Sequence, residues 1–277
     1  MTKLSIIIPM LNEADNIKNL LEHILQNVSQ KNNIEIIITD GGSTDGSQEI
    51  VANFSDVTLS ALVYRSKSEG EVERSQASRN KINTKVLDAK FANANSTRTD
   101  IQLLSAEKGR AKQMNLGAKH ASGNILYFLH ADSFPPKNFD QLIINEVEKG
   151  NSAGCFRLQF KSNHWWLRLA SWFTKFNWKA CRGGDQSQFI TRTLFNEIGG
   201  YDETFTIYED YILINALYAR KEFVVINKKI QTSARLYEIH GIWKLQYHFW
   251  MIYIKKWFGA SAEDLYKYYN NYINVKK

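Results

Sequence analysis

The stretch Leu126-Tyr127-Phe128-Leu129-His130-Ala131-Asp132 places an acidic residue shortly after four consecutive apolar residues. Such a short apolar run is typical of a buried strand. In open parallel α/β sheets, ligands bind in the crevice beyond the carboxyl ends of the strands. A carboxylate held there by a rigid strand suits a divalent cation that is shared with phosphate oxygens. Taken alone, however, Asp132 is equally well explained as a residue that caps or turns the chain before Pro135-Pro136.

Strands and helices alternate on both sides of this stretch. The first apolar strand is expected at 4–9, and an amphipathic helix follows it from Ile17 to Val28. The other elements expected up to residue 149 are strands at 34–39, 101–105 and 125–129, a helix that runs toward Phe54, and helices at 109–121 and 139–149. This order predicts an α/β fold with a mostly parallel sheet flanked by helices.

The second half of the chain is less regular. Its expected elements are a half-buried strand at 156–160, a short strand at 187–191, a helix at 192–198 and a helix that begins at Glu209-Asp210. Two segments, 164–178 and 243–258, combine aromatic with basic residues at helical spacing, and a last helix is expected at 262–272. Such segments suit either a membrane interface or packing on the main domain. We expect packing, with the aromatic side chains from Trp165 to Trp178 in the core; the alternative is that they stack on a sugar or lipid acceptor.

Residues 62–100 break the alternation of strands and helices, because they are rich in Ser, Lys, Arg, Glu and Asn and show no clean period. This composition indicates an insertion. We therefore expect one domain over 1–240, with an insertion at about 62–100. An amphipathic helical tail over 241–277 is expected to pack on or beside this domain.

The chain has 277 residues, a net charge of +7 and 44% hydrophobic residues, so wholesale disorder is excluded. The positive charge favours anionic partners, such as phosphorylated ligands or a membrane surface. No nucleic-acid recognition module is recognisable, and no nucleic-acid partner is expected. Cys155 and Cys181 form no metal motif, and neither a signal peptide nor a membrane-spanning run is recognisable. We expect a cytoplasmic protein, either free or peripheral at the inner face of the membrane.

Acidic residues recur where successive elements begin or end. They are Glu13, Asp40, Asp132 and the pair Glu209-Asp210. Three of them follow predicted parallel strands, so the fold should gather them along one edge of the sheet. Such an edge suits a nucleotide diphosphate, because acids can accept hydrogen bonds from the base and ribose while a metal ion bridges the phosphates. Arg110 would add positive charge at a helix N-terminus.

Two other classes of nucleotide-binding enzyme fit less well. A Rossmann dehydrogenase is set aside, because the first strand is followed by Pro-Met-Leu-Asn-Glu and not by Gly-x-Gly-x-x-Gly. A sugar nucleotidyltransferase is also disfavoured, because its Gly-rich first loop with Arg and Lys is missing.

A series of segments in a fixed order resembles one known family. They are Ser5-Ile6-Ile7-Ile8-Pro9-Met10-Leu11-Asn12-Glu13, Asp40-Gly41-Gly42-Ser43-Thr44-Asp45-Gly46-Ser47, Gly109-Arg110-Ala111-Lys112-Gln113-Met114-Asn115, Phe128-Leu129-His130-Ala131-Asp132, Gly184-Asp185-Gln186, Gly199-Gly200-Tyr201, Glu209-Asp210 and Thr232-Ser233-Ala234-Arg235. With these motifs the chain resembles an inverting family 2 glycosyltransferase of the GT-A fold, the Rossmann-like fold of nucleotide-diphospho-sugar transferases. More narrowly, it is similar to the bacterial subgroup called radical-SAM/selenodomain-associated transferase 2.

The resemblance implies a role for each matching residue. Pro9 and Glu13 would line the nucleotide pocket, and Asp40 would contact the base. Arg110 would approach the diphosphate, and Asp132 would bind Mn²⁺ or Mg²⁺. Asp185 is also expected to take part in donor binding, with a place on the acceptor side as the alternative.

His130 departs from the family pattern, because it stands where the family usually has the first acid of Asp-x-Asp. A neutral imidazole suits manganese better than magnesium, so His130 is a candidate metal ligand beside Asp132. The alternative is a hydrogen-bonding group next to the metal ligands.

Inverting transfer needs a base that removes the proton of the acceptor hydroxyl. Asp210, in the family's Glu-Asp position, is the candidate, and Glu209 is its orienting neighbour. Two acids at the start of a helix would also complement the helix dipole without any catalytic role.

The resemblance implies a metal-dependent inverting glycosyltransferase of the hexosyltransferase type. It would move a sugar from a UDP- or GDP-sugar to the hydroxyl of an unknown acceptor, which is a glycan, a lipid or a small molecule. The alternative is a membrane-peripheral module that binds nucleotide sugars without transferring them, an alternative that the substitution at His130 keeps open.

Overall fold

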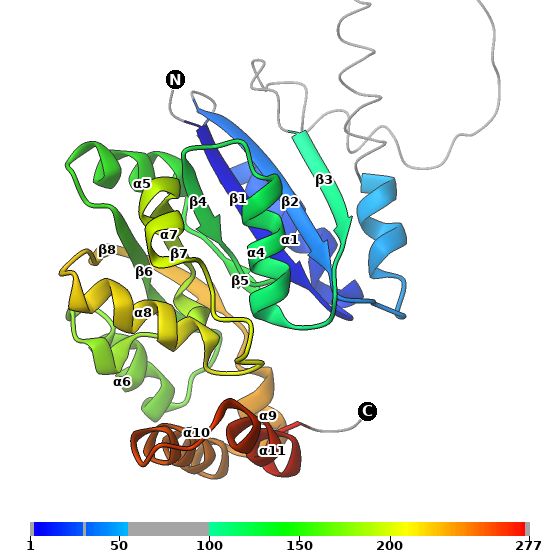
Figure 1. Ribbon diagram of the computed structural model, residues 1–277. Coiled ribbons are helices and arrows are strands. Elements are labelled where there is room, and N and C mark those ends of the chain that lie inside the picture. Colours follow the sequence, from blue (N-terminus) through cyan, green and yellow to red (C-terminus); the bar gives the residue numbers. More distant parts are fainter. Residues whose placement is uncertain (1–2, 30–31, 55–99, 275–277) are drawn as a thin grey trace, which may run out of the picture.

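A sheet of eight strands, in the order β3-β2-β1-β4-β7-β6-β8-β5, runs through the computed structural model (Figure 1). The structure describes residues 3–29, 32–54 and 100–274. The strands are β1 (Lys3–Met10), β2 (Asn33–Asp40), β3 (Asp100–Ser105), β4 (Ile125–Phe128), β5 (Ser133–Phe134), β6 (Ala153–Phe160), β7 (Gln188–Thr191) and β8 (Val224–Thr232). The insertion expected at about 62–100 lies outside the described residues, apart from Asp100 at the start of β3.

Four strands form the parallel part of the sheet. β1 pairs in parallel with β2 and β4, and β2 pairs in parallel with β3. β1 and β2 are buried along nearly their whole length, which is why they read as continuous apolar runs. Met10 and Asp40 are paired at the last position of each strand, so β1 and β2 end at the same edge. The strands predicted from the sequence at 4–9, 34–39, 101–105 and 125–129 are thus confirmed as β1 to β4.

The rest of the sheet is mixed. β7 is antiparallel to β4 and β6, β5 is antiparallel to β8, and β6 is parallel to β8. Among the described strands, four of the seven pairings are parallel, in line with the expected mostly parallel sheet. β5 and β8 were not among the expected strands.

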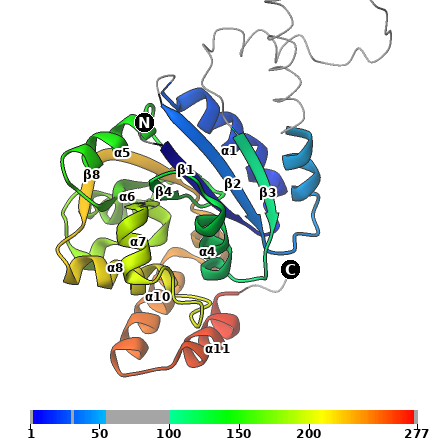
Figure 2. The same ribbon diagram turned by 45° about the horizontal axis from the view of Figure 1, so that its top comes forward.

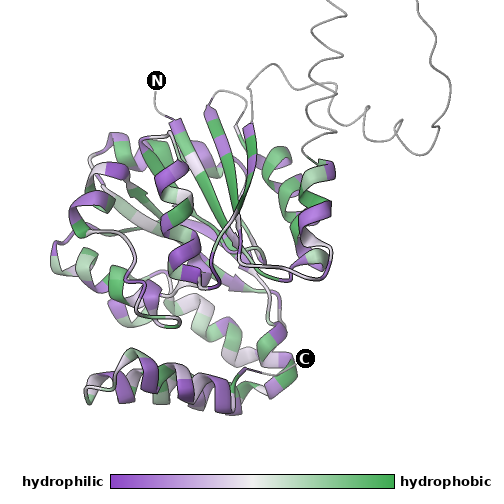
Figure 3. Ribbon diagram, turned by 45° about the vertical axis from the view of Figure 1, so that its right-hand side comes forward, coloured by the Kyte–Doolittle hydropathy of each residue, from purple (hydrophilic) through white to green (hydrophobic). Residues whose placement is uncertain are grey.

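Helices cover both faces of the sheet (Figures 1 and 2). They include α1 (Ala14–Asn27), α4 (Arg110–His120), α5 (Phe139–Glu148), α6 (Trp165–Phe173), α7 (Arg192–Ile198), α8 (Glu209–Ala219), α9 (Arg235–His240), α10 (Ile242–Trp257) and α11 (Ala262–Tyr272), with 3₁₀ turns η1 (Lys179–Cys181) and η2 (Gly184–Gln186). Residues 47–54 are also helical, where a helix toward Phe54 was expected. α1 and α5 pack on one face with Ile6 and Ile8 of β1, whereas α4, α7 and α8 pack on the other with Ile7. This division follows from the alternation of side chains along a strand. In Figure 3 the central strands are largely hydrophobic, whereas the helices carry both hydrophobic and hydrophilic residues.

The last helices lie beyond the carboxyl ends of β1 and β2 (Figure 1). A small core joins them to the segment before α8, and its members are Phe205, Leu245, Ile252, Leu265 and Ile273. Within the described ranges, no helix combines the length and the hydropathy that crossing a bilayer requires.

α6 is shorter than the helix expected over 164–178. It ends at Phe173, and the buried Thr174 follows it. The Thr174 hydroxyl donates to the carbonyl oxygen of Ser171 (2.6 Å) and accepts from the Leu158 N–H (3.0 Å). These bonds anchor the end of α6 on β6, so the chain turns there.

The expectation that the aromatic residues of this segment lie in the core is wrong. Trp165, Trp172 and Trp178 remain 59%, 45% and 54% exposed, and Leu167 is the buried residue of α6. Helical spacing alone does not distinguish a buried aromatic stripe from an exposed one.

Candidate active site

The acids predicted for donor binding lie at the carboxyl ends of three neighbouring strands. In the strand order β2-β1-β4, Asp40 ends β2, Glu13 follows β1, and Asp132 follows β4. The loops after β1 and β2 are joined, because the Asn12 N–H donates to Ser43 Oγ (2.8 Å). The fold therefore brings these acids to one edge of the sheet.

A cleft of about 290 Å³ opens between the two loops. Glu13 and Asp45 line it, together with Arg235 at the start of α9. Nη2 of Arg235 lies 3.5 Å from Glu13 Oε1. The volume is close to the lower end for small-molecule sites, which is about 300 Å³. Arg235 was not among the predicted site residues, although it ends one of the matching motifs.

Asp40 is 2% exposed and is engaged with its own loop. Its carboxylate accepts hydrogen bonds from the N–H groups of Gly42 (3.0 Å) and Ser43 (3.1 Å) and from Gln48 Nε2 (2.6 Å). Asp40 therefore fixes the shape of the loop that borders the cleft. Pro9 is buried within β1.

Asp132 is half-buried just after β4. Within the described residues, its carboxylate accepts one hydrogen bond, from the Ser133 hydroxyl at 3.4 Å. No cation in the described part of the chain pairs with it. Its oxygens are therefore available to a ligand.

Several ionisable residues meet where α4 and α8 begin. We call them the charged cluster, and its members are Arg110, His130, Asp185, Glu209 and Asp210. Nη1 of Arg110 lies 3.2 Å from Glu209 Oε1 and 3.8 Å from Asp210 Oδ2. His130 lies between two acids: its Nδ1 is 3.5 Å from Asp185 Oδ1, and its Nε2 is 3.9 Å from Asp210 Oδ2. Residues distant in the chain thus form one network.

The two adjacent acids of the cluster differ in their access to solvent. The side chain of Glu209 is 2% exposed, whereas that of Asp210 is 14% exposed. Burial raises the pKa of Glu209, the Arg110 charge lowers it, and Asp210 raises it again, so the net shift is well upward. Glu209 thus keeps a proton more readily than an ordinary glutamate.

His130 is held by its acidic neighbours. Burial and the nearby Arg110 act to lower the pKa of His130, but the contacts with Asp185 and Asp210 outweigh them and raise it. A protonated imidazole donates from both nitrogens and has no lone pair for a metal. Within the described residues, no group of three or more His, Cys, Asp or Glu side chains is arranged to hold a metal ion.

Gly184 allows the charged cluster to close. A Cβ at this position would lie 1.9 Å from Asp210 Oδ2 and 2.8 Å from His130 Cε1. Both distances are shorter than any real contact of this kind, so a side chain at residue 184 would displace Asp210 or the backbone. Sequence reasoning quoted Gly184 in a motif but assigned it no role, since no local signal reveals this approach.

Gln113 ties the start of α4 to the strand ends. Its Nε2 donates to the carbonyl oxygens of Met10 (2.8 Å) and Thr39 (2.6 Å), the last or next-to-last residues of β1 and β2. Because Arg110 begins the same helix, these bonds fix the charged cluster relative to the loops after β1 and β2.

Comparison with known proteins identifies relatives by sequence. The model of the family described as Glycosyl transferase family 2 matches residues 5–82 and 83–221, more than half of the chain. The curated glycosyltransferase AglE of Haloferax volcanii is 37% identical over 78 residues, which are 27% of this chain and 24% of the archaeal protein. The aligned part therefore spans about a quarter of that relative.

Two solved structures share the fold. Mannosyltransferase PcManGT from Pyrobaculum calidifontis, in complex with GDP-Man and Mn²⁺, matches with a TM-score of 0.57 at 15% identity, over 100% of this chain and 65% of that one. Residues 1–349 of S. aureus TarS, in complex with UDP, match with a TM-score of 0.55 at 14% identity, over 84% and 60%. The chain thus spans less than two thirds of either, and the likeness confirms the expected GT-A fold.

The ordered motifs place acids at the strand ends, and the structure gathers them along one edge of a GT-A sheet. The family match extends across the strands and helices that carry those acids. This chain belongs to glycosyl transferase family 2.

Proposed function

We propose that this protein is an inverting glycosyltransferase that moves a sugar from a UDP- or GDP-sugar to an acceptor hydroxyl, with Asp210 as the base. Family membership supports sugar transfer as the reaction class. The donor class is supported by the fold neighbours, which are described in complex with GDP-Man or UDP.

The donor would bind at the carboxyl edge of β1, β2 and β4. The cleft between the loops after β1 and β2 offers Glu13 and Asp45 as acceptors for base or ribose donors. Arg110 at the start of α4 offers a guanidinium and a helix N-terminus to the diphosphate. Asp40 supports this cleft through its loop bonds.

The assignment of Asp210 as base depends on the contrast with Glu209. Glu209 is nearly inaccessible and holds Arg110, whereas Asp210 is the more accessible carboxylate. A general base must reach the proton that it removes, so exposure favours Asp210. Glu209 would orient Arg110, whose Nη1 donates to Glu209 Oε1 at 3.2 Å.

Asp132 fits a divalent cation bound together with the donor. Its carboxylate is half-buried at a strand end and has one weak hydrogen bond among the described residues. Mg²⁺ or Mn²⁺ is commonly held by one or two carboxylates plus substrate phosphates, so a pre-formed set of protein ligands is not required. When bound, such a cation would neutralise charge on the departing nucleoside diphosphate.

The contacts of His130 favour an orienting role over metal ligation. Both of its ring nitrogens face carboxylates, Nδ1 toward Asp185 and Nε2 toward Asp210. We therefore propose that His130 holds Asp210 and Asp185 in place on the acceptor side. A cytoplasmic location belongs to the same proposal, and the two free thiols, Cys155 and Cys181, support it.

The observation that carries the proposal is the Asp210 carboxylate, which is more accessible than that of Glu209 and is held beside Arg110 and His130. Asp210→Asn should keep donor binding and lower turnover by about 10²–10⁴-fold, the usual contribution of a general base. The measurement is donor turnover with manganese, alongside nucleotide binding by titration calorimetry.

Glu148→Gln, which neutralises an exposed acid on α5, is the control and should leave both properties unchanged. Full turnover by Asp210→Asn would show that the base is another residue. Donor binding with no turnover in the wild type, across a panel of nucleotide sugars and acceptors, would favour the alternative of a binding module.

A further inference from the structure

All seven tryptophans of the chain lie in two segments, 165–178 and 243–257. Six of them are 45–84% exposed to solvent, and we call these six the tryptophan surface. They are Trp165, Trp172, Trp178, Trp243, Trp250 and Trp257. Tryptophan is highly buried on average, so this concentration of exposed indoles needs a partner.

The two segments touch each other in the fold. The rings of Trp165 and Trp243 are 5.8 Å apart between centroids, and those of Trp166 and Trp243 are 5.2 Å apart. Nε1 of Trp166 donates to Gln246 Oε1 at 3.2 Å. α6 and α10 therefore present their exposed aromatic residues from adjoining helices.

α10 is apolar on two sides. Leu245, His248 and Ile252 face the interior. An outer stripe repeats at intervals of four and three residues and is 43–84% exposed; its members are Trp243, Tyr247, Trp250, Ile254 and Trp257. Because this spacing keeps side chains on one face of a helix, α10 carries a second apolar face. α6 contacts this face at Trp243 and Trp250, and its members stay 43–84% exposed.

Within the two segments that carry this surface, the charged residues are all basic. Neither 164–182 nor 241–262 contains an acidic residue. The basic residues there include Arg168, Lys175 and Lys179 on one segment, and Lys244, Lys255 and Lys256 on the other. A second copy of the chain would bring like charges together, which disfavours self-association through this surface. Anionic lipid headgroups, in contrast, attract basic side chains, and tryptophan favours the membrane interface.

The tryptophan surface adjoins the charged cluster. On α10, Tyr253 lies between the exposed Trp250 and Trp257 in sequence, and its ring is 5.1 Å from that of Tyr211. Tyr211 directly follows Asp210 on α8. A bilayer that met α10 would therefore lie close to the site of transfer.

We propose that the tryptophan surface, carried by α6, the segment that follows it and α10, docks this protein on an anionic membrane. Indole rings enter the interface between headgroups and acyl chains, and the surrounding basic residues pair with the headgroups. This inference goes beyond sugar transfer, and it would hold whether Asp210 is the base or not.

The test is co-sedimentation of the full chain with vesicles of phosphatidylcholine alone or mixed with phosphatidylglycerol. The wild type should bind the mixed vesicles at least about tenfold more tightly, since several cations face the surface, and salt should weaken this binding. Tryptophan emission should shift to the blue on binding, because every indole of the chain lies in the docking region.

Two pairs of variants separate the contributions. Trp257→Ser with Phe258→Ser removes the most exposed rings, at 84% and 81%, and should weaken binding at least about tenfold. Leu103→Ser, an exposed apolar residue of β3, is the matched control. Lys179→Glu with Lys244→Glu should abolish the preference for anionic vesicles, whereas Lys18→Glu with Lys119→Glu, the same change in net charge elsewhere, should preserve it.

Nucleotide binding by each variant checks that it is folded and keeps this test separate from the test of sugar transfer. A wild type that ignores anionic vesicles overturns the docking proposal even if it transfers sugar. A second result would also overturn it: the wild type is a dimer that binds no vesicles, and Trp257→Ser with Phe258→Ser makes it a monomer. The partner of the tryptophan surface would then be a second copy of the chain.

Discussion

At the scale of single residues, the site depends on how closely side chains approach backbone. Gly184 lies against the Asp210 carboxylate, so the position of the proposed base is set by a residue without a side chain. Its neighbour Gly183 has open space around the position of a Cβ, and its φ of −168° is extended backbone that any residue adopts. A side chain would therefore be accommodated at residue 183 but not at residue 184.

Gly184→Ala should lower turnover by about 10²-fold, because a catalytic group displaced by about 1 Å loses rate on that order. The added Cβ would stand 1.9 Å from Asp210 Oδ2, so the carboxylate must move. Turnover under saturating donor measures the effect, and Gly183→Ala is the control that should retain the wild-type rate. Equal rates for the two variants would contradict the geometry of the cluster.

At the scale of elements, the sequence pattern predicts strands well where both faces are buried. β1 and β2 are continuous apolar runs, and their limits follow directly from the sequence. β8 escapes prediction because Asn227-Lys228-Lys229 interrupts its apolar residues with exposed side chains. Its strand conformation comes from pairing with β6, which includes a register shift after Phe156, and no local pattern encodes such a distant partner.

In the candidate site, too, some features could be predicted from the sequence and others only from the fold. The acids of the charged cluster could be named from motifs, because their spacing relative to strand and helix ends is visible in the sequence. The cleft contact of Arg235 with Glu13 joins residues 222 positions apart, and only the fold brings them together. His130 was recognised as unusual, but its acidic neighbours could not be inferred from its position in the chain.

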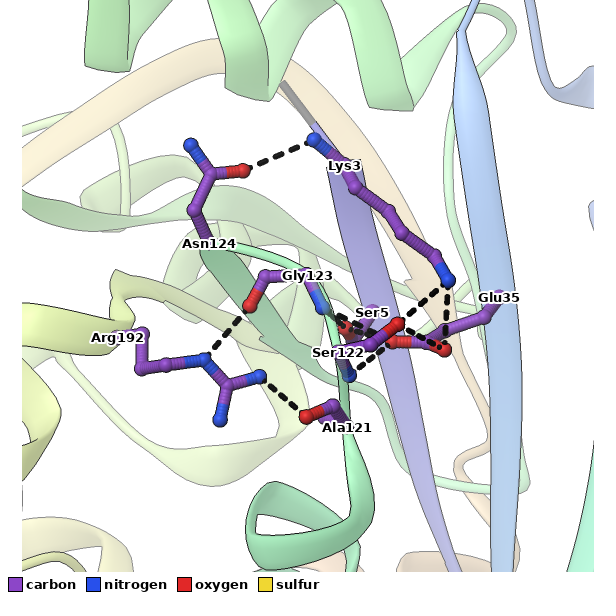
Figure 4. Close-up of polar contacts among 8 residues, drawn as sticks. All are labelled: Lys3, Ser5, Glu35, Ala121, Ser122, Gly123, Asn124 and Arg192. Carbon is purple, nitrogen blue, oxygen red and sulfur yellow. Dashed lines mark hydrogen bonds and ion pairs between the residues drawn. The ribbon is translucent and has the colours of Figure 1, made fainter. Parts of the chain in front are cut away.

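A cluster around Glu35 joins several elements at the opposite end of the sheet (Figure 4). Glu35 on β2 accepts hydrogen bonds from the Ser5 hydroxyl of β1 (2.5 Å) and from the Ser122 N–H (2.6 Å), and it pairs with Lys3 Nζ at 2.9 Å. Arg192 holds the same loop after α4, since its Nη2 donates to the Ala121 carbonyl oxygen at 2.7 Å. These contacts fix the loop between α4 and β4.

This cluster predicts an acid-sensitive contribution to stability. Burial acts to raise the pKa of Glu35, but hydrogen bonds from Ser5, Lys3 and Ser122 outweigh it and lower the pKa from 4.5 to about 2. An acid with a depressed folded-state pKa stabilises the fold above its unfolded pKa, here by about 3 kcal/mol, and loses that contribution as the pH falls from about 4.5 toward 2.

Urea unfolding of the wild type and Glu35→Gln at pH 7 and pH 3 measures this contribution. The variant should be less stable at pH 7, and the difference should shrink at pH 3. Glu148→Gln, at an exposed position of α5, should follow the wild type at both values. A difference that does not depend on pH would mean that packing, and not the charge of Glu35, provides the stability.

At the scale of the whole molecule, the fold joins a rigid parallel sheet to loops that converge at one edge. β1, β2 and β4 are neighbours, so a ligand that spans their ends bridges three elements at once. The loops after β1 and β2 are already joined by hydrogen bonds, whereas Asp132 after β4 has one weak partner among the described residues. A bound nucleotide and cation would therefore add a link between β4 and the other two strands.

This link predicts that nucleotide diphosphate and Mn²⁺ together raise the melting temperature more than either does alone, because a ligand that binds only the folded state stabilises it by mass action. Asp132→Ala should remove the joint effect and leave the melting temperature of the free protein within a few degrees, since a half-buried side chain with one weak hydrogen bond contributes little to folding. Thermal unfolding with UDP or GDP, with and without Mn²⁺, provides the measurement, and Asp202→Asn, in the turn before α8, is the control. If Asp132→Ala keeps the full joint shift, the cation is held by other groups, and the carboxyl end of β4 is not where metal and diphosphate meet.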